Sequence, residues 1–181
     1  MKNVLKIIGI AILLLLVFRG FIYRHTISYT PIKTKTTIPL TNKKILTKIS
    51  AAIDNQQLDV TQIVRIASSI TNNQLQFTFQ KISNNPNKIM VTQKANCVGY
   101  AAFFNAIVHY IIDKKGLQNH YQARHLVGKL DFLGVDLHQF FTDSFYQNHD
   151  YNLIEDKKTG ETILLDPSLD DYLWIGFQSL P

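Results

Sequence analysis

Cysteine is nearly absent from this chain of 181 residues, which has one, Cys97. A single thiol cannot form an internal disulfide, so the sequence excludes a small scaffold held together by disulfide bonds. Charged residues are also sparse, at 18% against 46% hydrophobic residues. A chain of this length and composition can bury one sizeable core but hardly two.

Several motifs that would define a function are missing. The sequence contains no internal repeat, no low-complexity block and no glycine-rich loop of the kind that cradles phosphate. Its formal net charge of +6 permits contact with anionic lipid, but the basic residues are scattered and no nucleic-acid-binding motif accompanies them. His138, Asp143 and His149 do not have the spacing of a compact zinc site. We therefore expect no nucleic-acid partner, no metal and no organic cofactor.

The amino terminus holds the one long apolar run. No polar side chain interrupts Ile7–Phe18, which as a helix covers only about 18 Å of a hydrocarbon core of about 30 Å. Extended to Val4–Tyr23, with its flanking cations at the interfaces, the segment is long enough to cross a bilayer. A cleaved signal peptide has an apolar region of similar length, but residues 19–24 contain no small-x-small cleavage pattern. Residues 1–24 are predicted to be a membrane anchor or uncleaved signal.

The rest of the chain divides into a linker and one folded domain. Residues 25–40 contain two prolines and no sustained period, which predicts an extended stalk. Residues 41–181 are the expected domain. Capping residues and apolar stripes predict helices from Asn42 to Asn55 and from Asp59 to about Ile70. Residues 84–87 have the composition of a turn.

The clearest predicted helix begins at Cys97. Asn96 is a good N-terminal cap, apolar residues follow at helical spacing, and Gly116 after two lysines marks the end. The positive end of the helix dipole lies at Cys97, where it favours a thiolate over a thiol. Val98 and Gly99 beside the thiol are expected to leave room for a substrate to approach.

The pattern changes from helix to strand after Tyr121. Strands are predicted at residues 123–131, 145–155 and 161–166, with a turn-rich loop joining the last two into a hairpin. Helices followed by antiparallel strands indicate an α+β fold. His149 lies in the second strand and Asp166 closes the third.

The register of this hairpin decides whether His149 and Asp166 meet. A loop that closes symmetrically about Lys157 and Lys158 makes them direct cross-strand partners on one face. A bulge at Gly160 shifts the register by one residue instead. The sequence leaves this choice open.

Cys97, His149 and Asp166 follow one another in the order of a thiol nucleophile, its base and the carboxylate that orients the base. Each residue also has an ordinary structural explanation. A buried free cysteine often serves as a small hydrophobe, a strand histidine is often exposed, and an aspartate before Pro167 is typical of a turn. The other histidines compete as bases: His25, His109, His120, His125 and His138.

Three short segments resemble the transglutaminase-like superfamily, the circularly rearranged branch of the papain-like thiol enzymes. They are Asn96–Ala101, His149–Asn152 and Leu165–Ser168, and the layout of residues 41–173 is similar to the family's core of helices packed on an antiparallel sheet. The resemblance implies Cys97 as nucleophile, His149 as base and acid, and Asp166 as orienting residue. Tyr151 keeps the aromatic residue common two positions after the family's histidine, whereas Asp150 between them departs from the pattern.

The resemblance implies a cysteine protease, an amidase or a transglutaminase-type acyltransferase, which acts on a peptide or protein amide through a Cys97 thioester. The backbone amide of Cys97 is the expected oxyanion donor, with the Gln93 side chain as a second candidate. Two other functions remain open. One is a catalytically inactive transglutaminase-like binding module anchored to the membrane, and the other is a tethered structural protein in which Cys97 is part of the core.

The side of the membrane is not decided by the sequence. Cations lie on both sides of the apolar run, and their count by the positive-inside rule mildly favours a cytoplasmic body. Short amino-terminal anchors before hydrolytic domains more often hold the body outside. We therefore predict a single-pass protein of the cell envelope that contacts membrane lipid through residues 1–24, and leave its orientation open.

Overall fold

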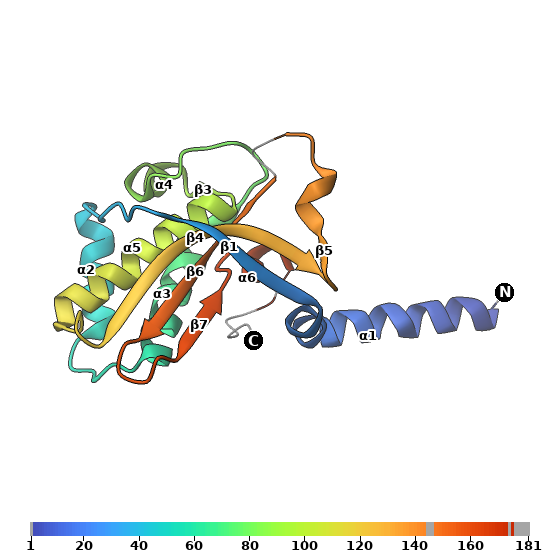
Figure 1. Ribbon diagram of the computed structural model, residues 1–181, viewed down its shortest axis with the longest axis horizontal. Coiled ribbons are helices and arrows are strands. Elements are labelled where there is room, and N and C mark those ends of the chain that lie inside the picture. The colour runs from blue at the N-terminus through green and yellow to red at the C-terminus, as the bar shows by residue number, and fades with distance from the viewer. Residues whose placement is uncertain (1, 144–146, 174, 176–181) are drawn as a thin grey trace.

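The computed structural model describes residues 2–143, 147–173 and 175. It confirms the predicted α+β class: helices pack against an antiparallel sheet, and an apolar helix projects from the body at the N-terminus (Figure 1). The helices are α1 (Lys2–Thr26), α2 (Lys43–Ile53), α3 (Val60–Gln74), α4 (Pro86–Thr92), α5 (Cys97–Lys115) and α6 (Leu169–Leu173), with a 3₁₀ turn η1 (Leu137–Phe140). The strands are β1 (Ile27–Lys35), β2 (Gln76–Phe77), β3 (Lys94–Ala95), β4 (Tyr121–Phe132), β5 (Val135–Asp136), β6 (His149–Asp156) and β7 (Thr162–Leu165).

The main sheet has the strand order β1-β4-β6-β7, and every neighbouring pair in it is antiparallel. β5 forms a short hairpin with the end of β4, and β2 pairs with β3 in a separate parallel ladder. α5 packs against β4 and β6 of the sheet and against α3 on its other side. This arrangement explains why α5 is buried almost all round, since a helix between two layers needs an apolar surface on each side.

Local sequence signals account for the helices. Asn42 caps α2, Asp59 forms a capping box with Gln62 at the start of α3, and Asn96 caps α5. α5 ends at Gly116, whose φ of 66° is the left-handed conformation that glycine adopts without steric cost. The predictions for these three helices are confirmed.

The predicted stalk is wrong. Residues 27–35 are not a linker but strand β1, which pairs with β4 from Ile27 opposite Phe132 to Lys35 opposite His125. The segment is rich in Ile, Thr and Tyr, which favour strands, and Pro31 is tolerated because β1 lies at the sheet edge and its register shifts there. The folded body therefore begins at residue 27 rather than at residue 41.

Two smaller predictions also need correction. The expected turn at residues 84–87 is the start of α4, because Asn85 caps a helix that has Pro86 in its first turn. The strand predicted from residue 145 begins at His149, and residues 145 and 146 lie outside the described part of the chain.

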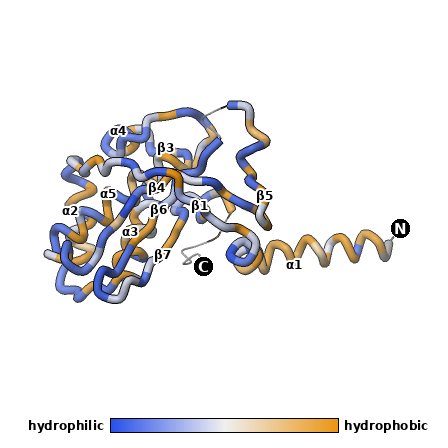
Figure 2. The backbone as a smooth tube through the Cα atoms, viewed as in Figure 1, coloured by the Kyte–Doolittle hydropathy of each residue, from blue (hydrophilic) through white to orange (hydrophobic). Residues whose placement is uncertain are grey.

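The N-terminal helix is apolar and exposed. Its segment Val4–Thr26 is long and apolar enough to cross a membrane, and its most apolar stretch is not buried against the body. Figure 2 shows that hydrophobic residues predominate along α1. A helix of this kind near an N-terminus is typical of a membrane anchor or of a signal sequence.

Candidate active site

Cys97 is the first residue of α5 and is half-buried. The Asn96 side chain fixes the chain there, since its oxygen accepts a hydrogen bond from the Gly99 amide at 3.2 Å and its nitrogen donates one to the Gln80 carbonyl at 3.0 Å. The expectation that Gly99 leaves room for substrate is wrong. A Cβ atom on Gly99 would lie 2.9 Å from Ala95 Cβ and 3.1 Å from a methyl of Ile89, so this glycine lets α5 pack closely on its neighbours.

His149 opens β6, and its ring links the other two predicted residues. His149 Nε2 lies 2.5 Å from Asp166 Oδ2, and both side chains are buried. The Cys97 side chain interacts with the same ring closely enough to raise the pKa of His149. Because Asp166 occupies Nε2, Nδ1 is the nitrogen left for the thiol. The structure thus brings Cys97, His149 and Asp166 together in the predicted order.

The Asp166 side chain is itself held in place by Ser168, two residues further along the chain. Its Oδ1 atom accepts hydrogen bonds from the Ser168 amide at 2.9 Å and from the Ser168 hydroxyl at 2.6 Å. The carboxylate therefore presents Oδ2 to His149 while Oδ1 is fixed by a tight turn. Sequence reasoning missed Ser168 in this role, although an Asp-Pro-Ser turn is the kind of local signal that indicates it.

The hairpin register differs from both sequence alternatives. β6 and β7 pair with Asn152 opposite Leu165, which is two residues away from the symmetric closure. An even shift keeps each side chain on its face of the sheet. His149 and Asp166 are therefore not direct partners but diagonal ones, and they still meet on one face.

The pKa of His149 lies well above its ordinary value of 6.5. Burial by itself lowers it, because a buried cation is poorly solvated. The negative charge and hydrogen bond of Asp166, followed by the interactions with Cys97, outweigh burial and favour the protonated ring. The His149 ring therefore holds a proton more readily than a free histidine does.

Tyr29 of β1 covers this site, a contact that sequence reasoning missed. Its ring centroid lies 6.1 Å from that of His149 and 4.7 Å from that of Tyr151. Its hydroxyl hydrogen-bonds at 2.5 Å to the hydroxyl of Tyr23 in α1. The ring of His138 lies 5.8 Å from that of His149. The N-terminal helix and the first strand are thus part of the site's surroundings.

Gly128 allows this close packing, because it stands opposite Pro31 on one side and opposite His149 on the other. A Cβ atom there would clash with the Thr30 carbonyl oxygen and lie 2.9 Å from the Tyr151 hydroxyl.

We expect Gly128→Ala to destabilise the protein by about 1–3 kcal/mol, the usual cost of overpacking. Urea unfolding measures this change. Gly9→Ala, where nothing lies within 4 Å of the new methyl, is the matched control, and equal stability of the two variants would contradict the prediction.

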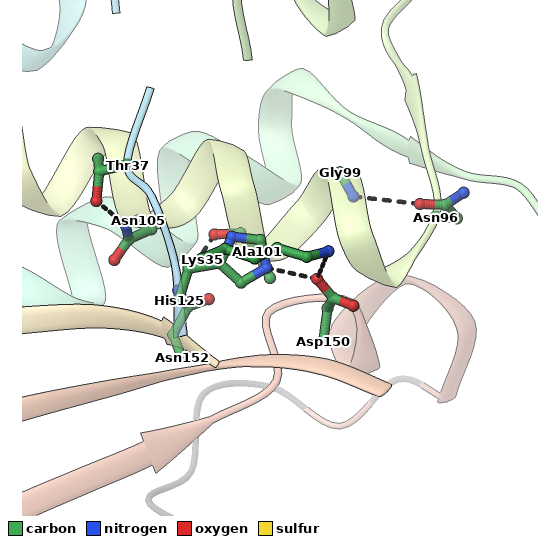
Figure 3. Close-up of polar contacts among 9 residues, drawn as sticks. All are labelled: Lys35, Thr37, Asn96, Gly99, Ala101, Asn105, His125, Asp150 and Asn152. Carbon is green, nitrogen blue, oxygen red and sulfur yellow. Dashed lines mark hydrogen bonds and ion pairs between the residues drawn. The ribbon is translucent and has the colours of Figure 1, made fainter. Parts of the chain in front are cut away.

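A second histidine–aspartate pair lies on the opposite face of β6. Asp150 Oδ2 accepts hydrogen bonds from His125 Nε2 at 2.6 Å and from the Lys35 ammonium, and Figure 3 shows both groups converging on the carboxylate beside α5. Burial raises the pKa of Asp150, but the bonds from His125 and Lys35 bring it below the ordinary value. Asp150 thus belongs to a buried cluster separate from the His149 site.

The backbone bulge in β1 separates these two sites. Tyr29 and Lys35 are six residues apart and would share one face of a regular strand. The register shift between Pro31 and Lys33 moves Lys35 to the other face. One strand therefore supplies Tyr29 to the His149 site and Lys35 to the Asp150 cluster.

The remaining candidates for the site are less well placed. Gln93 ends α4 with an exposed side chain and a φ of 55°, so the amide of Cys97 at the start of α5 is the better oxyanion donor. Among the described residues, no group of three or more His, Cys, Asp and Glu side chains is placed to hold a metal ion.

Comparisons with protein-family models, with curated proteins and with solved structures find no match for this chain. Its own residues are therefore the basis for assigning a function.

Proposed function

We propose that the protein is a thiol-dependent amide hydrolase or acyl transferase of the transglutaminase-like type. The observation that carries this proposal is the buried His149 ring, which is hydrogen-bonded to Asp166 at 2.5 Å and interacts with the Cys97 side chain. A nucleophile in contact with a base that a third group orients is the arrangement used in covalent catalysis.

The proposed reaction begins with attack of the Cys97 sulfur on an amide carbonyl, with its proton held by His149. A carbon–sulfur bond forms, and the developing oxyanion accepts hydrogen bonds from backbone amides at the start of α5. His149 then gives its proton to the leaving amine as the carbon–nitrogen bond breaks, which leaves a thioester on Cys97. Water or a second amine attacks the thioester carbonyl, and His149 removes the proton from that attacking group. The carbon–sulfur bond then breaks, which releases the acid or the new amide and returns the Cys97 sulfur, with its proton held by His149.

Asp166 is proposed to act through His149. Its carboxylate holds the ring by Nε2 and stabilises the imidazolium, so that Nδ1 stays directed at the thiol. Because the Asp166 side chain is fully buried, water does not screen this interaction as it would at the surface.

We further propose that α1 is a single-pass anchor rather than a removed signal sequence. Tyr23 and Arg19 support this, since both contact the folded body: Tyr23 bonds Tyr29, and Arg19 Nε donates to the Leu173 carbonyl at 2.9 Å. Removal of α1 would take these contacts away from the surroundings of the site. The substrate class that fits is a peptide or protein amide near a membrane.

Alkylation of Cys97 by iodoacetamide at pH 7 tests the proposed nucleophile. We expect the folded protein to react about tenfold faster than the same protein unfolded in urea, because only the folded protein holds the thiol at a helix N-terminus and beside a base that can take its proton. Mass spectrometry measures the adduct, and the unfolded chain is the matched control because it carries the identical thiol. A folded-state rate equal to or below the unfolded rate would contradict catalysis and favour the inactive binding module.

A further inference from the structure

The β4–β5 hairpin and the turn after it expose an unusual amount of apolar surface. The residues are Phe132, Leu133, Val135, Phe140 and Phe141, with exposed fractions of 42%, 69%, 47%, 72% and 49%. Scattered single apolar residues are normal on a soluble surface, whereas a group of large ones marks an interaction site.

This apolar group lies beside the end of the N-terminal helix. The Leu133 amide donates a hydrogen bond to the carbonyl of Thr26, the last residue of α1, at 2.8 Å, and Phe132 pairs with Ile27 at the start of β1. α1 passes into β1 without a linker. Figure 1 shows the hairpin tip next to the point where α1 leaves the body.

The two-residue turn of the hairpin has a strained backbone and an apolar side chain that faces solvent. Leu133 and Gly134 have φ of 49° and 84°, and a two-residue turn with both angles positive normally has Asn or Gly at its first position. A leucine there strains the backbone and also presents a large apolar side chain to solvent. Transfer of that side chain into lipid offsets both costs.

A cationic residue adjoins the apolar tip. Arg24 stands in the last turn of α1, two residues from the carbonyl that Leu133 contacts. Apolar side chains bordered by cations are typical of segments that lie in the headgroup region, where the cations meet lipid phosphate and the apolar groups enter the acyl chains.

We propose that the hairpin Phe132–Val135, with Phe140 and Phe141, inserts into the interface of the bilayer that α1 crosses. This inference rests on the proposed anchoring role of α1 and not on the catalytic role of Cys97. Insertion of the hairpin fixes the folded body to the bilayer at two points, α1 and the hairpin. Tyr29 follows Thr26 by three residues, a span of about 10 Å along a strand, so the candidate active site is held close to the lipid surface.

The test uses the full-length chain in vesicles of phosphatidylcholine and phosphatidylglycerol. In a Cys97→Ser background, Leu133→Cys is labelled with an environment-sensitive nitrobenzoxadiazole dye. Phe140→Cys serves as a second reporter outside the strained turn. Val91→Cys on α4 is the matched control, since Val91 is 84% exposed and α4 lies across the body from α1 (Figure 1).

We expect blue-shifted emission from the dye at Leu133 and Phe140. Lipids spin-labelled near the headgroup are expected to quench most of that emission. The dye at Val91 keeps the emission it shows in water. Emission at both hairpin positions that matches Val91 would overturn the proposal, and so would a blue shift without lipid quenching, which indicates contact with protein. Flotation of the chain with the vesicles reports on the α1 anchor separately, and alkylation of Cys97 in the wild-type chain reports on the proposed catalysis.

Discussion

Asp166→Asn is expected to slow the acylation of Cys97 by p-nitrophenyl acetate at pH 7 by about 10²-fold, within the usual range for loss of acid–base assistance. The amide can still accept a hydrogen bond from His149 but carries no charge. The electrostatic attraction that holds the imidazolium beside the thiol is therefore lost. Release of p-nitrophenolate measures the rate, and mass spectrometry of the acetylated protein locates the adduct.

The same variant is expected to lower the pKa of His149. In the wild-type protein burial lowers this pKa and Asp166 is the first of the groups that raise it, with the balance well above 6.5. A pKa raised on folding means that the protonated ring stabilises the fold fully below about pH 6.5, and that this stabilisation is lost as the pH rises through the higher folded value. With Asp166 neutralised the folded pKa is lower, so this stabilisation is smaller and is completely lost at a lower pH. Titration of the His149 ring by NMR follows this shift directly.

Asp113→Asn is the matched control for this experiment, because Asp113 is an exposed aspartate near the end of α5 whose side chain accepts a bond from Gln118. We expect it to acylate at the wild-type rate. If Asp166→Asn also kept the wild-type rate and the wild-type His149 pKa, Asp166 would have no orienting role and its bond to the ring would be structural.

The sequence predicted the site residues because each one carries a local signal. Cys97 follows a helix cap, His149 lies in a strand, and Asp166 closes one, so their elements could be placed without knowledge of the rest of the fold. Their meeting could not be derived with the same certainty, because it depends on the hairpin register. The register observed is two residues away from the symmetric one, and the prediction of a shared face held because that difference is even.

The parts that were missed are those that depend on distant pairing. β1 contains a proline, Pro31, and has no helical or strict strand period, and it is ordered by hydrogen bonds to β4, about a hundred residues later. The local sequence pattern of a strand does not identify a pairing partner so far away in the chain. Tyr29 was overlooked for the same reason, since its position beside His149 follows only once β1 is known to be a strand.

The cluster of Lys35, His125 and Asp150 was missed because its members come from three strands. Lys35 stands opposite His125, which stands opposite Asn152, and Asp150 lies two residues from Asn152 on the same face. The register of two ladders is needed to see that these charges meet. In the sequence they appear only as a lysine in a supposed linker, one of six histidines and an unusual acid after His149.

Asp150→Asn is expected to lower the free energy of unfolding by about 3–5 kcal/mol at pH 7, the usual cost of breaking a buried ion pair. Asp150 and His125 are each only 3% exposed, so His125 and Lys35 would lose the one carboxylate that compensates them. The folded-state pKa of Asp150 is lowered, since the bonds from His125 and Lys35 outweigh burial. Its stabilisation is therefore present above about pH 4, the unfolded value, and is lost as the pH falls through the lower folded value.

Urea unfolding of Asp150→Asn and of the exposed control Asp54→Asn measures this difference, and the control is expected to change stability by no more than about 0.5 kcal/mol. A loss for Asp150→Asn as small as the control's would mean that the cluster does not hold the sheet together.

The roles of the two buried histidine–aspartate pairs are distinguished by comparing the reaction rate of Cys97 and the stability in the two aspartate variants. Asp166→Asn is expected to slow Cys97 strongly at modest cost in stability, whereas Asp150→Asn is expected to cost stability while folded molecules keep the wild-type rate. The opposite pattern would transfer the catalytic role from His149 to His125, because both histidines have a carboxylate partner and only their relation to Cys97 distinguishes them.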